Sequence, residues 1–346
     1  MHHPHVLFIL RDVNAPSNDY LSTAASGVAV SSRMIAQGIR DFCDASIAAV
    51  SEESEIDYIL SKHPQATHVV IETLWVTPQT IRGLCEKYSD KQWLIRDHSE
   101  SCFRVLEPNA FGWILSYLDS GVKVLCNGKG LDDLYAMASG AGYSTDLVGW
   151  GPNLYPVSQE DVEIRHNNTS IARIGCFGSV RPMKNHITQA LAAIRFATAM
   201  GVSVEFHING YTIPGYVDPV LNNLRDMFMN MMNCSLIEHD WMSHDDFLGL
   251  LKTMDICSQV SFTETFNVVA ADAVNGDVPI IVSKEIPWVG SYAVRSAQDV
   301  ADIAEGYTTI WNEGFFCRRR RLRSQRKDLR NHNISAYDAW YRLLTY

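Results

Sequence analysis

The sequence predicts an α/β protein made of two parallel-sheet domains. The chain has 346 residues, which is enough for two domains that each bury a core of their own. Short apolar runs alternate with helical patterns of about 10–15 residues, as in consecutive βαβ units. Residues 148–156, which are dense in glycine and proline, separate two such series. We interpret this segment as the connection between the domains.

The first series lies in an expected domain of residues 1–157. A short apolar run predicts each of its strands, and residues 6–10 form the first of them rather than part of a signal peptide. The strands are expected at residues 6–10, 45–50, 68–72, 92–96 and 122–126, and the helices at residues 31–42, 55–62, 77–88 and 130–139.

The second series lies in an expected domain of residues 170–330. Strands are expected at residues 171–177, 202–208, 235–238, 255–260 and 279–282, and helices at residues 185–200, 219–232, 243–253 and 267–274. An amphipathic pattern over residues 337–344 predicts a terminal helix.

Composition narrows the class of protein. No apolar run approaches the roughly 20 residues that a membrane-spanning helix needs. The eight cysteines form no Cys-x-x-Cys pair, which favours reduced, buried thiols in a cytoplasmic protein.

The net charge of −10 is unevenly distributed. Residues 1–170 carry a net charge of −9, which disfavours broad contact with nucleic-acid phosphates in that half. The run from Arg318 to Arg330 instead holds eight basic residues and one acid. It is either a local nucleic-acid contact or a solvated helical face.

The most informative segment spans residues 262–283. Glu264 ends a predicted loop, a helix follows from Asn267, Gly276 ends the helix, and a short apolar strand comes next. The N-terminus of a helix favours a phosphate. Asp272 lies eight residues after Glu264, so we expect both carboxylates on one side of the helix, about two turns (~12 Å) apart. One would face a reacting sugar and the other a ribose; the alternative is an ordinary amphipathic helix packed on a sheet.

A second segment, residues 175–185, joins a predicted strand to a predicted helix. It contains Gly178, Arg181, Lys184 and Asn185. Two cations at such a junction can neutralise a diphosphate as it leaves, and they are unfavourable at a helix start unless an anion lies there. The alternative is a pair of surface cations.

The first domain offers weaker candidates. Gly27 precedes a helix and is either a close backbone approach to a ligand or an ordinary turn. His98 follows the strand at residues 92–96 and is either a ligand-contacting or a structural histidine. Its neighbours Arg96 and Asp97 are less favoured candidates.

The segment from Glu264 through Phe266, Asn267 and Asp272 to Pro279 resembles the Glu-x7-Glu signature of retaining glycosyltransferases with the GT-B fold. The likeness is to family 4 (glycosyl transferases group 1), with aspartate replacing the second glutamate. It is strong over residues 172–290 and mostly architectural over residues 1–150. It implies two Rossmann-like domains facing across a cleft, and a C-terminal helix, residues 331–346, that returns to the first domain.

The resemblance also implies roles for individual residues. Glu264 would orient the sugar and stabilise developing charge, Arg181 and Lys184 would hold the donor diphosphate, and His98 would lie near the donor sugar. The implied donor-binding residues are Gly27, Gly178, Asn185, Phe266, Asn267, Val268 and Asp272. No Asp-x-Asp motif occurs, so no metal and no cofactor beyond the nucleotide-sugar co-substrate is expected.

The expected activity is therefore retaining transfer of a hexosyl or pentosyl group from a nucleotide sugar to an acceptor hydroxyl. UDP-sugar is the expected donor and GDP-sugar the second choice, with a saccharide or other glycan acceptor in bacterial or viral glycan synthesis. Two alternatives remain open. One is a bacteriophage-type enzyme that glycosylates hydroxymethylated bases in DNA, with Arg318 to Arg330 as a DNA contact, and the other is a non-catalytic sugar-nucleotide-binding module.

Overall fold

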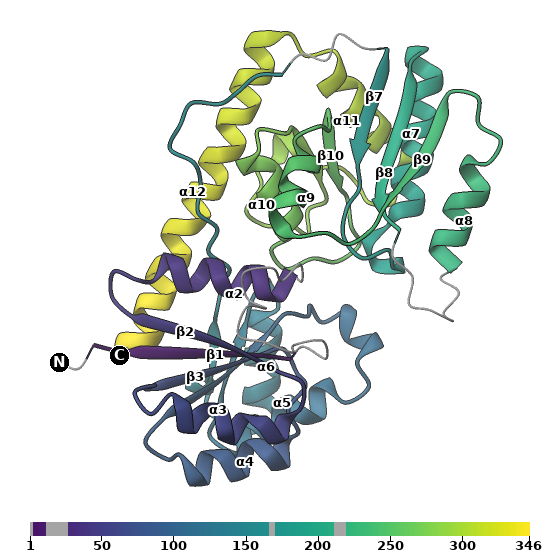
Figure 1. Cartoon of the computed structure of the whole chain (residues 1–346). Coiled ribbons are helices and arrows are strands. Elements are labelled where there is room, and N and C mark those ends of the chain that lie inside the picture. The colour runs from purple at the N-terminus through teal and green to yellow at the C-terminus, as the bar shows by residue number, and fades with distance from the viewer. Residues whose placement is uncertain (1–2, 12–26, 166–169, 211–218) are drawn as a thin grey trace. The chain divides into compact units, whose positions relative to one another are not determined.

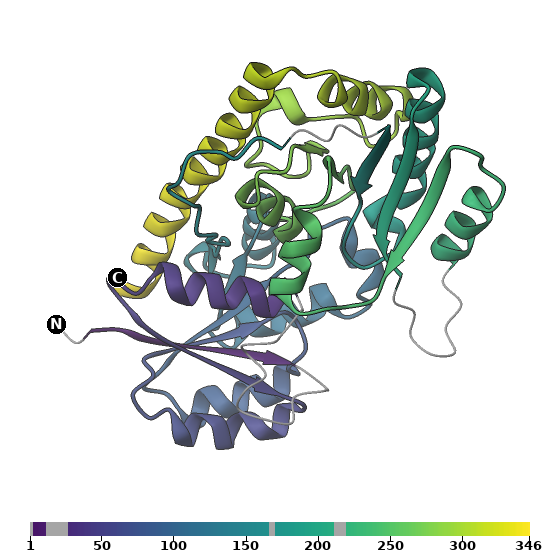
Figure 2. The same cartoon turned by 45° about the horizontal axis from the view of Figure 1, so that its top comes forward.

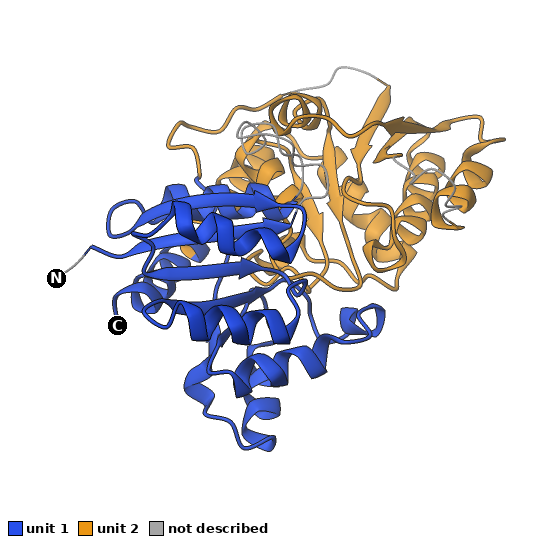
Figure 3. Ribbon diagram, turned by 60° about the horizontal axis from the view of Figure 1, so that its bottom comes forward, with its two compact units in different colours: residues 1–156, 332–346 blue, residues 157–331 orange. Residues whose placement is uncertain are grey.

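The computed structural model describes residues 3–11, 27–165, 170–210 and 219–346, which form two compact units (Figure 3). Unit 1 consists of Met1–Pro156 and His332–Tyr346, and unit 2 of Val157–Asn331. Each unit is a parallel sheet with helices on its faces, so the predicted α/β class is confirmed.

Unit 1 is built on a parallel sheet with the strand order β2-β1-β3-β4-β5-β6 (Figure 1). Its described strands are β1 (His5–Arg11), β2 (Asp44–Val50), β3 (His68–Glu72), β4 (Gln92–Asp97), β5 (Lys123–Cys126) and β6 (Val148–Trp150). Its described helices are α2 (Gly27–Gly38), α3 (Ile56–Lys62), α4 (Pro78–Lys87), α5 (Ala110–Asp119), α6 (Leu131–Gly140) and the end of α12 (Phe315–Thr345).

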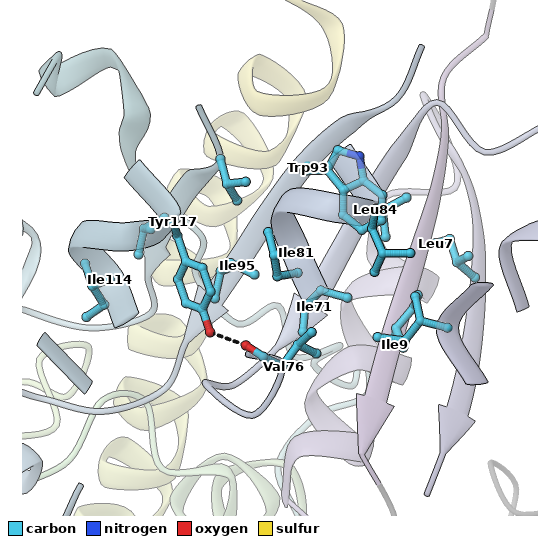
Figure 4. Packing of buried hydrophobic residues seen from close by; sticks show 14 of the residues in the cluster. Leu7, Ile9, Ile71, Val76, Ile81, Leu84, Trp93, Ile95, Ile114 and Tyr117 are labelled. Carbon is cyan, nitrogen blue, oxygen red and sulfur yellow. Dashed lines mark hydrogen bonds between the residues drawn. The ribbon is translucent and has the colours of Figure 1, made fainter. Parts of the chain in front are cut away.

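Alternate residues of the central strands of unit 1 bury two separate apolar faces, as the two-residue period of a strand requires. Leu7 and Ile9 join the cluster formed with α3, α4, α5 and α6 (Figure 4). Within it, the Tyr117 hydroxyl donates a 2.5 Å hydrogen bond to the Val76 carbonyl, which satisfies the only polar atom of that buried side chain. Phe8 faces the other way and packs with α2 and the end of α12.

Two elements of unit 1 differ from the prediction. Helix α5 was not expected from the sequence. The glycine-rich segment is not a linker at its start, because Val148–Trp150 pairs with β5 as a parallel edge strand. A Cβ atom on Gly149 or Gly151 would lie about 3 Å from the side chain of Leu125. The glycines therefore permit close packing on the sheet, and the chain passes to unit 2 only after Pro156.

Unit 2 is built on a second parallel sheet with the strand order β11-β10-β7-β8-β9. Its described strands are β7 (Ile171–Gly175), β8 (Ser203–Asn209), β9 (Cys234–His239), β10 (Ile256–Gln259) and β11 (Ile280–Val282). Its described helices are α7 (His186–Met200), α8 (Pro219–Phe228), α9 (His244–Leu251), α10 (Val268–Asn275), α11 (Val300–Trp311) and the start of α12. The expected alternation is confirmed, and α11 is an addition.

Helices α7, α8 and α11 share one apolar cluster with the strands of unit 2. Phe196 of α7 packs edge-on against Tyr307 of α11, with ring centroids 6.1 Å apart. Helices α9 and α10 contact each other, and α10 contacts β10 and β11 (Figure 2). The loops between these strands and helices carry the candidate site of unit 2.

The terminal helix is longer than predicted. The sequence indicates a helix at residues 337–344, whereas α12 runs from Phe315 to Thr345 and the boundary between the units falls inside it. Trp340 is completely buried in unit 1. Its ring packs edge-on against Phe8 at 5.8 Å, and its indole N–H donates to the Pro152 carbonyl at 2.7 Å. Among the described residues, no helix is long and apolar enough to cross a membrane.

We predict that Trp340→Ala destabilises unit 1 by about 3–5 kcal/mol, because it leaves a cavity and an unpaired carbonyl in the core. Chemical denaturation measures the change. The matched control is Tyr346→Ala, whose side chain is 93% exposed and whose loss is expected to cost no more than about 0.5 kcal/mol. Equal stability of the two variants would contradict the packing described here.

Candidate functional site

The candidate residues of unit 2 follow the carboxyl ends of β7 and β10. Neighbouring parallel strands end at the same edge of a sheet, where open α/β folds bind ligands. The segment from Gly178 to Asn185 follows β7, and Glu264 to Asn267 follow β10, which is hydrogen-bonded to β7. The sheet therefore brings together the two predicted segments.

An ion pair joins the two segments directly. Lys184 Nζ lies 2.5 Å from Glu264 Oε1, although the residues are 80 positions apart in sequence. The Glu264 side chain is 7% exposed and that of Lys184 is 17% exposed. The pair is thus largely removed from water, where electrostatic interactions are stronger than at the surface.

Asn267 holds Glu264 in place and begins helix α10. Its backbone has φ = 63°, a conformation that asparagine tolerates better than most residues. Its Nδ2 donates to Glu264 Oε1 at 3.0 Å and to Gln259 Oε1 at 2.9 Å, and its Oδ1 accepts from the Ala270 N–H at 2.8 Å. One side chain therefore both caps the helix and orients the carboxylate.

The expectation that both carboxylates lie on one side of a helix is wrong. Helix α10 begins at Val268, so Glu264 lies in the preceding loop and only Asp272 lies on the helix. The left-handed residue at Asn267 turns the chain between them, and helical spacing does not relate the two groups. Asp272 instead accepts a 2.9 Å hydrogen bond from His244 Nε2 at the start of α9, and its side chain is 2% exposed.

Phe266 and Val268 flank Asn267. Phe266 is buried, its ring lies 5.6 Å from that of Trp288, and its carbonyl accepts a 2.7 Å hydrogen bond from Trp288 Nε1. Val268 is the half-buried first residue of α10. No acidic residue occurs in the first turn of α10, so Glu264, bonded to the N-cap Asn267, is the carboxylate at the positive end of its dipole.

The loop after β7 depends on two further backbone turns. Gly178 has φ = 107°, which suits glycine, and its N–H donates to Asn209 Oδ1 at 2.8 Å. Asn185 has φ = 59°, and its Nδ2 donates to the carbonyls of Val260 and Ala297 at 2.9 and 2.8 Å. These bonds fix the backbone on both sides of Arg181, which is exposed.

A second polar cluster lies in unit 1, at the carboxyl ends of β3 and β4. Glu72 and Arg96 form an ion pair with a 3.0 Å contact, and neither side chain is exposed to solvent. His98 Nε2 lies 2.5 Å from Glu72 Oε2, and this ring is 16% exposed. Asp97 pairs separately with Arg104.

The predicted residues of unit 1 thus have different surroundings. His98 belongs to the buried cluster, and Gly27 is the exposed first residue of α2. A Cβ atom on Gly27 would meet no described atom within 4 Å, so no close packing there requires glycine. Residues 25 and 26, which precede it, lie outside the described residues.

Sequence reasoning missed several residues of both clusters. Glu72, Asn127 and Asn153 surround Arg96 in unit 1, whereas Asn209 and His244 support the site of unit 2. Glu72 and Asn209 end apolar strands, and a polar residue at that position was the signal that could have identified them.

The basic run on α12 makes many contacts within unit 2. Arg326 pairs with Asp277 at 2.7 Å, Arg321 pairs with Glu313 at 2.5 Å, and Arg319 and Arg323 both pair with Asp161. Arg318 and Arg326 are buried, so the run is not simply a solvated face. These contacts tie the segment after Pro156 to the helix and give most of the arginines an internal role.

His186, the first residue of α7, is a buried titratable group beside the site. It is 1% exposed. Burial lowers the pKa of His186 to about 3; the charges of Lys184 and Arg181 act in the same direction, and a hydrogen bond with the Cys176 backbone opposes them. The ring is therefore neutral at physiological pH.

Neither a protein-family model nor a curated protein matches this chain. Solved structures do resemble it in fold. HepE from Anabaena in complex with UDP and glucose is 11% identical with a TM-score of 0.66, covering 99% of this chain and 100% of that chain. The UDP-forming α,α-trehalose-phosphate synthase from Burkholderia vietnamiensis is 10% identical with a TM-score of 0.66, covering 99% and 97%.

A third similar structure is the UDP-forming synthase from Burkholderia xenovorans in complex with glucose-6-phosphate. It is 13% identical with a TM-score of 0.64 and covers 98% of this chain and 100% of that chain. At these identities the likeness concerns the fold, and the chain has the predicted GT-B fold. Membership of family 4 stays a prediction.

We predict that His186 makes the protein less stable in mild acid. Between pH 6.5, the ordinary pKa of histidine, and about 3, the unfolded chain binds a proton that the native protein does not bind. This difference lowers the free energy of unfolding as the pH falls, by about 2 kcal/mol near pH ~5, and has no effect above about pH 7.5.

Denaturant unfolding of wild type and His186→Gln at both pH values measures this contribution. The variant should lose about 2 kcal/mol less than wild type on acidification, since glutamine does not titrate. Parallel losses in the two proteins would show that His186 is already protonated, or solvated, in the native state.

Proposed function

We propose that this protein is a retaining glycosyltransferase that moves a sugar from a nucleotide diphosphate donor, with UDP-sugar as the preferred donor, to an acceptor hydroxyl. The observation that carries the proposal is the hydrogen-bonded set of Lys184, Glu264 and Asn267 beside the start of α10. It puts a cation, a carboxylate and a helix N-terminus together at the carboxyl ends of two neighbouring strands. A sugar diphosphate needs these groups, since its anomeric carbon becomes positive as its phosphates take up negative charge.

The proposed donor contacts follow from the chemistry of each group. A lysine ammonium has three N–H donors and Glu264 accepts one of them, so Lys184 retains donors for a diphosphate oxygen. Arg181, exposed on the same loop, adds a second cation, and the N-terminus of α10 adds a partial positive charge. Gly178 and Asn185 fix the backbone of this loop. Phe266 and Val268 provide the apolar surface beside it. Asp272, together with His244, binds the ribose.

The proposed reaction keeps the configuration of the anomeric carbon. The bond from that carbon to the diphosphate oxygen breaks while the acceptor oxygen approaches the same face of the sugar. The acceptor proton passes to the departing diphosphate, whose charge Arg181 and Lys184 stabilise. Glu264 stabilises the positive sugar without forming a bond to it, and no metal is assigned to this step.

UDP is the preferred nucleotide because two kinds of similar protein bind or form it. HepE is in complex with UDP and glucose, and the trehalose-phosphate synthases are UDP-forming. A saccharide or other glycan is the preferred acceptor. The DNA alternative loses support because several arginines between Arg318 and Arg330 pair with carboxylates of unit 2.

We predict that Glu264→Gln lowers the turnover of UDP-sugars about 10²–10³-fold, since it removes the charge that stabilises the positive sugar. Release of UDP from a panel of UDP- and GDP-sugars, with water as the acceptor, measures the effect. Glu305→Gln, at an exposed position on α11, is the matched control and should keep wild-type turnover. Equal turnover by Glu264→Gln and wild type would refute the role of Glu264. If wild type and variants bind a nucleotide sugar but none turns it over, the result would favour a non-catalytic binding module.

We predict that Lys184→Met weakens UDP binding about tenfold, or ~1.4 kcal/mol, because it removes a charge-assisted hydrogen bond to the diphosphate. Isothermal titration with UDP and with uridine tests this. The variant should lose affinity for UDP but not for uridine, and Lys327→Met, exposed on α12, should change neither. A similar loss for both ligands would place Lys184 away from the phosphates.

A further inference from the structure

The buried ion pair of unit 1 is not explained by a contribution to the stability of the fold. Glu72 and Arg96 are inaccessible to solvent, and transfer of such a pair from water costs several kcal/mol per ion before their attraction offsets it. Apolar residues of similar size are often at least as stabilising at such positions. His98 is the member of this trio that reaches solvent, so the pair is arranged around a ring that a ligand can contact.

The charges of the cluster are well defined. Arg96 Nη1 donates to both carboxylate oxygens of Glu72, at 3.2 and 3.0 Å, and Ser32 Oγ donates to Oε1 at 2.9 Å. Burial opposes the ionisation of Glu72, but the charge of Arg96 and the hydrogen bonds from His98 and Ser32 outweigh it, so the pKa of Glu72 lies below its ordinary value. Glu72 is thus an anion, and it only accepts hydrogen bonds.

The anion determines which nitrogen of His98 carries the proton. His98 Nε2 lies 2.5 Å from Glu72 Oε2 and 3.2 Å from Arg96 Nη1. A bare nitrogen lone pair facing a carboxylate at the shorter distance would be repulsive, whereas an Nε2–H donates a strong hydrogen bond to it. The shorter contact therefore decides the tautomer. In the neutral ring the proton is on Nε2, and Nδ1 is the acceptor.

The amide of Asn127 agrees with this assignment. Its Oδ1 accepts from Arg96 Nη2 at 3.2 Å, which directs its Nδ2 toward the ring, where it lies 3.5 Å from His98 Nδ1. That distance is at the outer limit of a hydrogen bond, so Nδ1 keeps the capacity to accept a better donor.

We propose that Glu72 and Arg96 are positioning residues that hold His98 as its Nε2–H tautomer and so present Nδ1 as an acceptor for a sugar hydroxyl. The other donors of Arg96 bind the Gly151 carbonyl at 2.7 Å and Asn153 Oδ1. These bonds fix the guanidinium group, which in turn fixes the Glu72 carboxylate. The hydroxyl ligand rests on the proposed function, whereas the tautomer does not.

The tautomer is tested first without any substitution. Long-range ¹⁵N–¹H NMR spectra of the histidine rings distinguish a protonated from an unprotonated nitrogen, and His98→Asn assigns the signals. The neutral ring of His98 in wild type is expected to carry its proton on Nε2 only. An Nδ1–H form, or an even mixture of the two, would overturn the proposal.

The double variant Glu72→Leu/Arg96→Leu tests the positioning role. It replaces both charges with apolar groups, so it leaves no unpaired buried ion and should fold. Its His98 should become a mixture of tautomers, and its kcat/KM for glycosyl transfer should fall about 10–100-fold, the range found when the carboxylate partner of a metal-bound histidine is removed. Ser32→Ala, which removes one hydrogen bond to Glu72 but none to His98, should keep the tautomer and most of the activity.

These results separate this proposal from the proposed function. Wild-type kcat/KM in the double variant, together with inactivity of Glu264→Gln, would refute the role of Glu72 and Arg96 while glycosyl transfer stands. If instead neither wild type nor any variant turns over a UDP-sugar, the proposed function fails, and the NMR result alone decides the tautomer. If the double variant does not fold, the wild-type spectrum decides the tautomer, and the kcat/KM of Glu72→Gln, which keeps the size of the side chain and is expected to fall at least about tenfold, decides the positioning role.

Discussion

The parallel order of both sheets is the constraint on which the rest of the structure depends. Helices cover both faces of such a sheet, so its strands are apolar over most of their length and a polar group is accommodated where a strand ends. Glu72 and Asn209 each take the last or nearly last position of their strand, and Gln259 does the same in β10. A single edge of each sheet therefore collects hydrogen-bonding groups that the chain could not place elsewhere at comparable cost.

The two clusters use ion pairs in different ways. In unit 1 the pair of Glu72 and Arg96 is inaccessible to water, and only His98, which is hydrogen-bonded to Glu72, is partly exposed within this trio. In unit 2 Lys184 and Glu264 are partly accessible, so an anionic ligand can share the cation directly. Strained backbone at Asn185 and Asn267 supports the second cluster, and several hydrogen bonds hold each turn against that strain. The energetic cost of one site is thus mostly electrostatic, and that of the other is partly conformational.

Much of the fold was predictable because the hydrophobic periodicity and the positions of glycine and proline indicate the same elements along the chain. Helix α5 was missed although its buried residues, among them Ala110, Ile114 and Leu118, follow helical spacing. The first half of α12 was missed because its buried face is largely polar, with Arg318, Gln325 and Arg326 beside Leu322 and Leu329. The candidate site was only partly predictable. A spacing of eight residues singled out the segment whose Glu264 pairs with Lys184 but gave it the wrong geometry, since a left-handed turn lies between the carboxylates. The importance of Glu72 follows from burial, which one strand's sequence does not reveal.

The division of unit 1 into two chain segments affects how the protein is made. The chain leaves this unit at Pro156 and rejoins it at His332, so the ribosome supplies the residues that complete its core only after it has made unit 2. At common rates of synthesis, tens of seconds separate the first strand from Trp340. During that interval the sheet face around Phe8 lacks its aromatic cover, and a chaperone or a second nascent chain can bind it. Unit 1 begins before unit 2 in the sequence, yet its core is completed only after unit 2 has been synthesised.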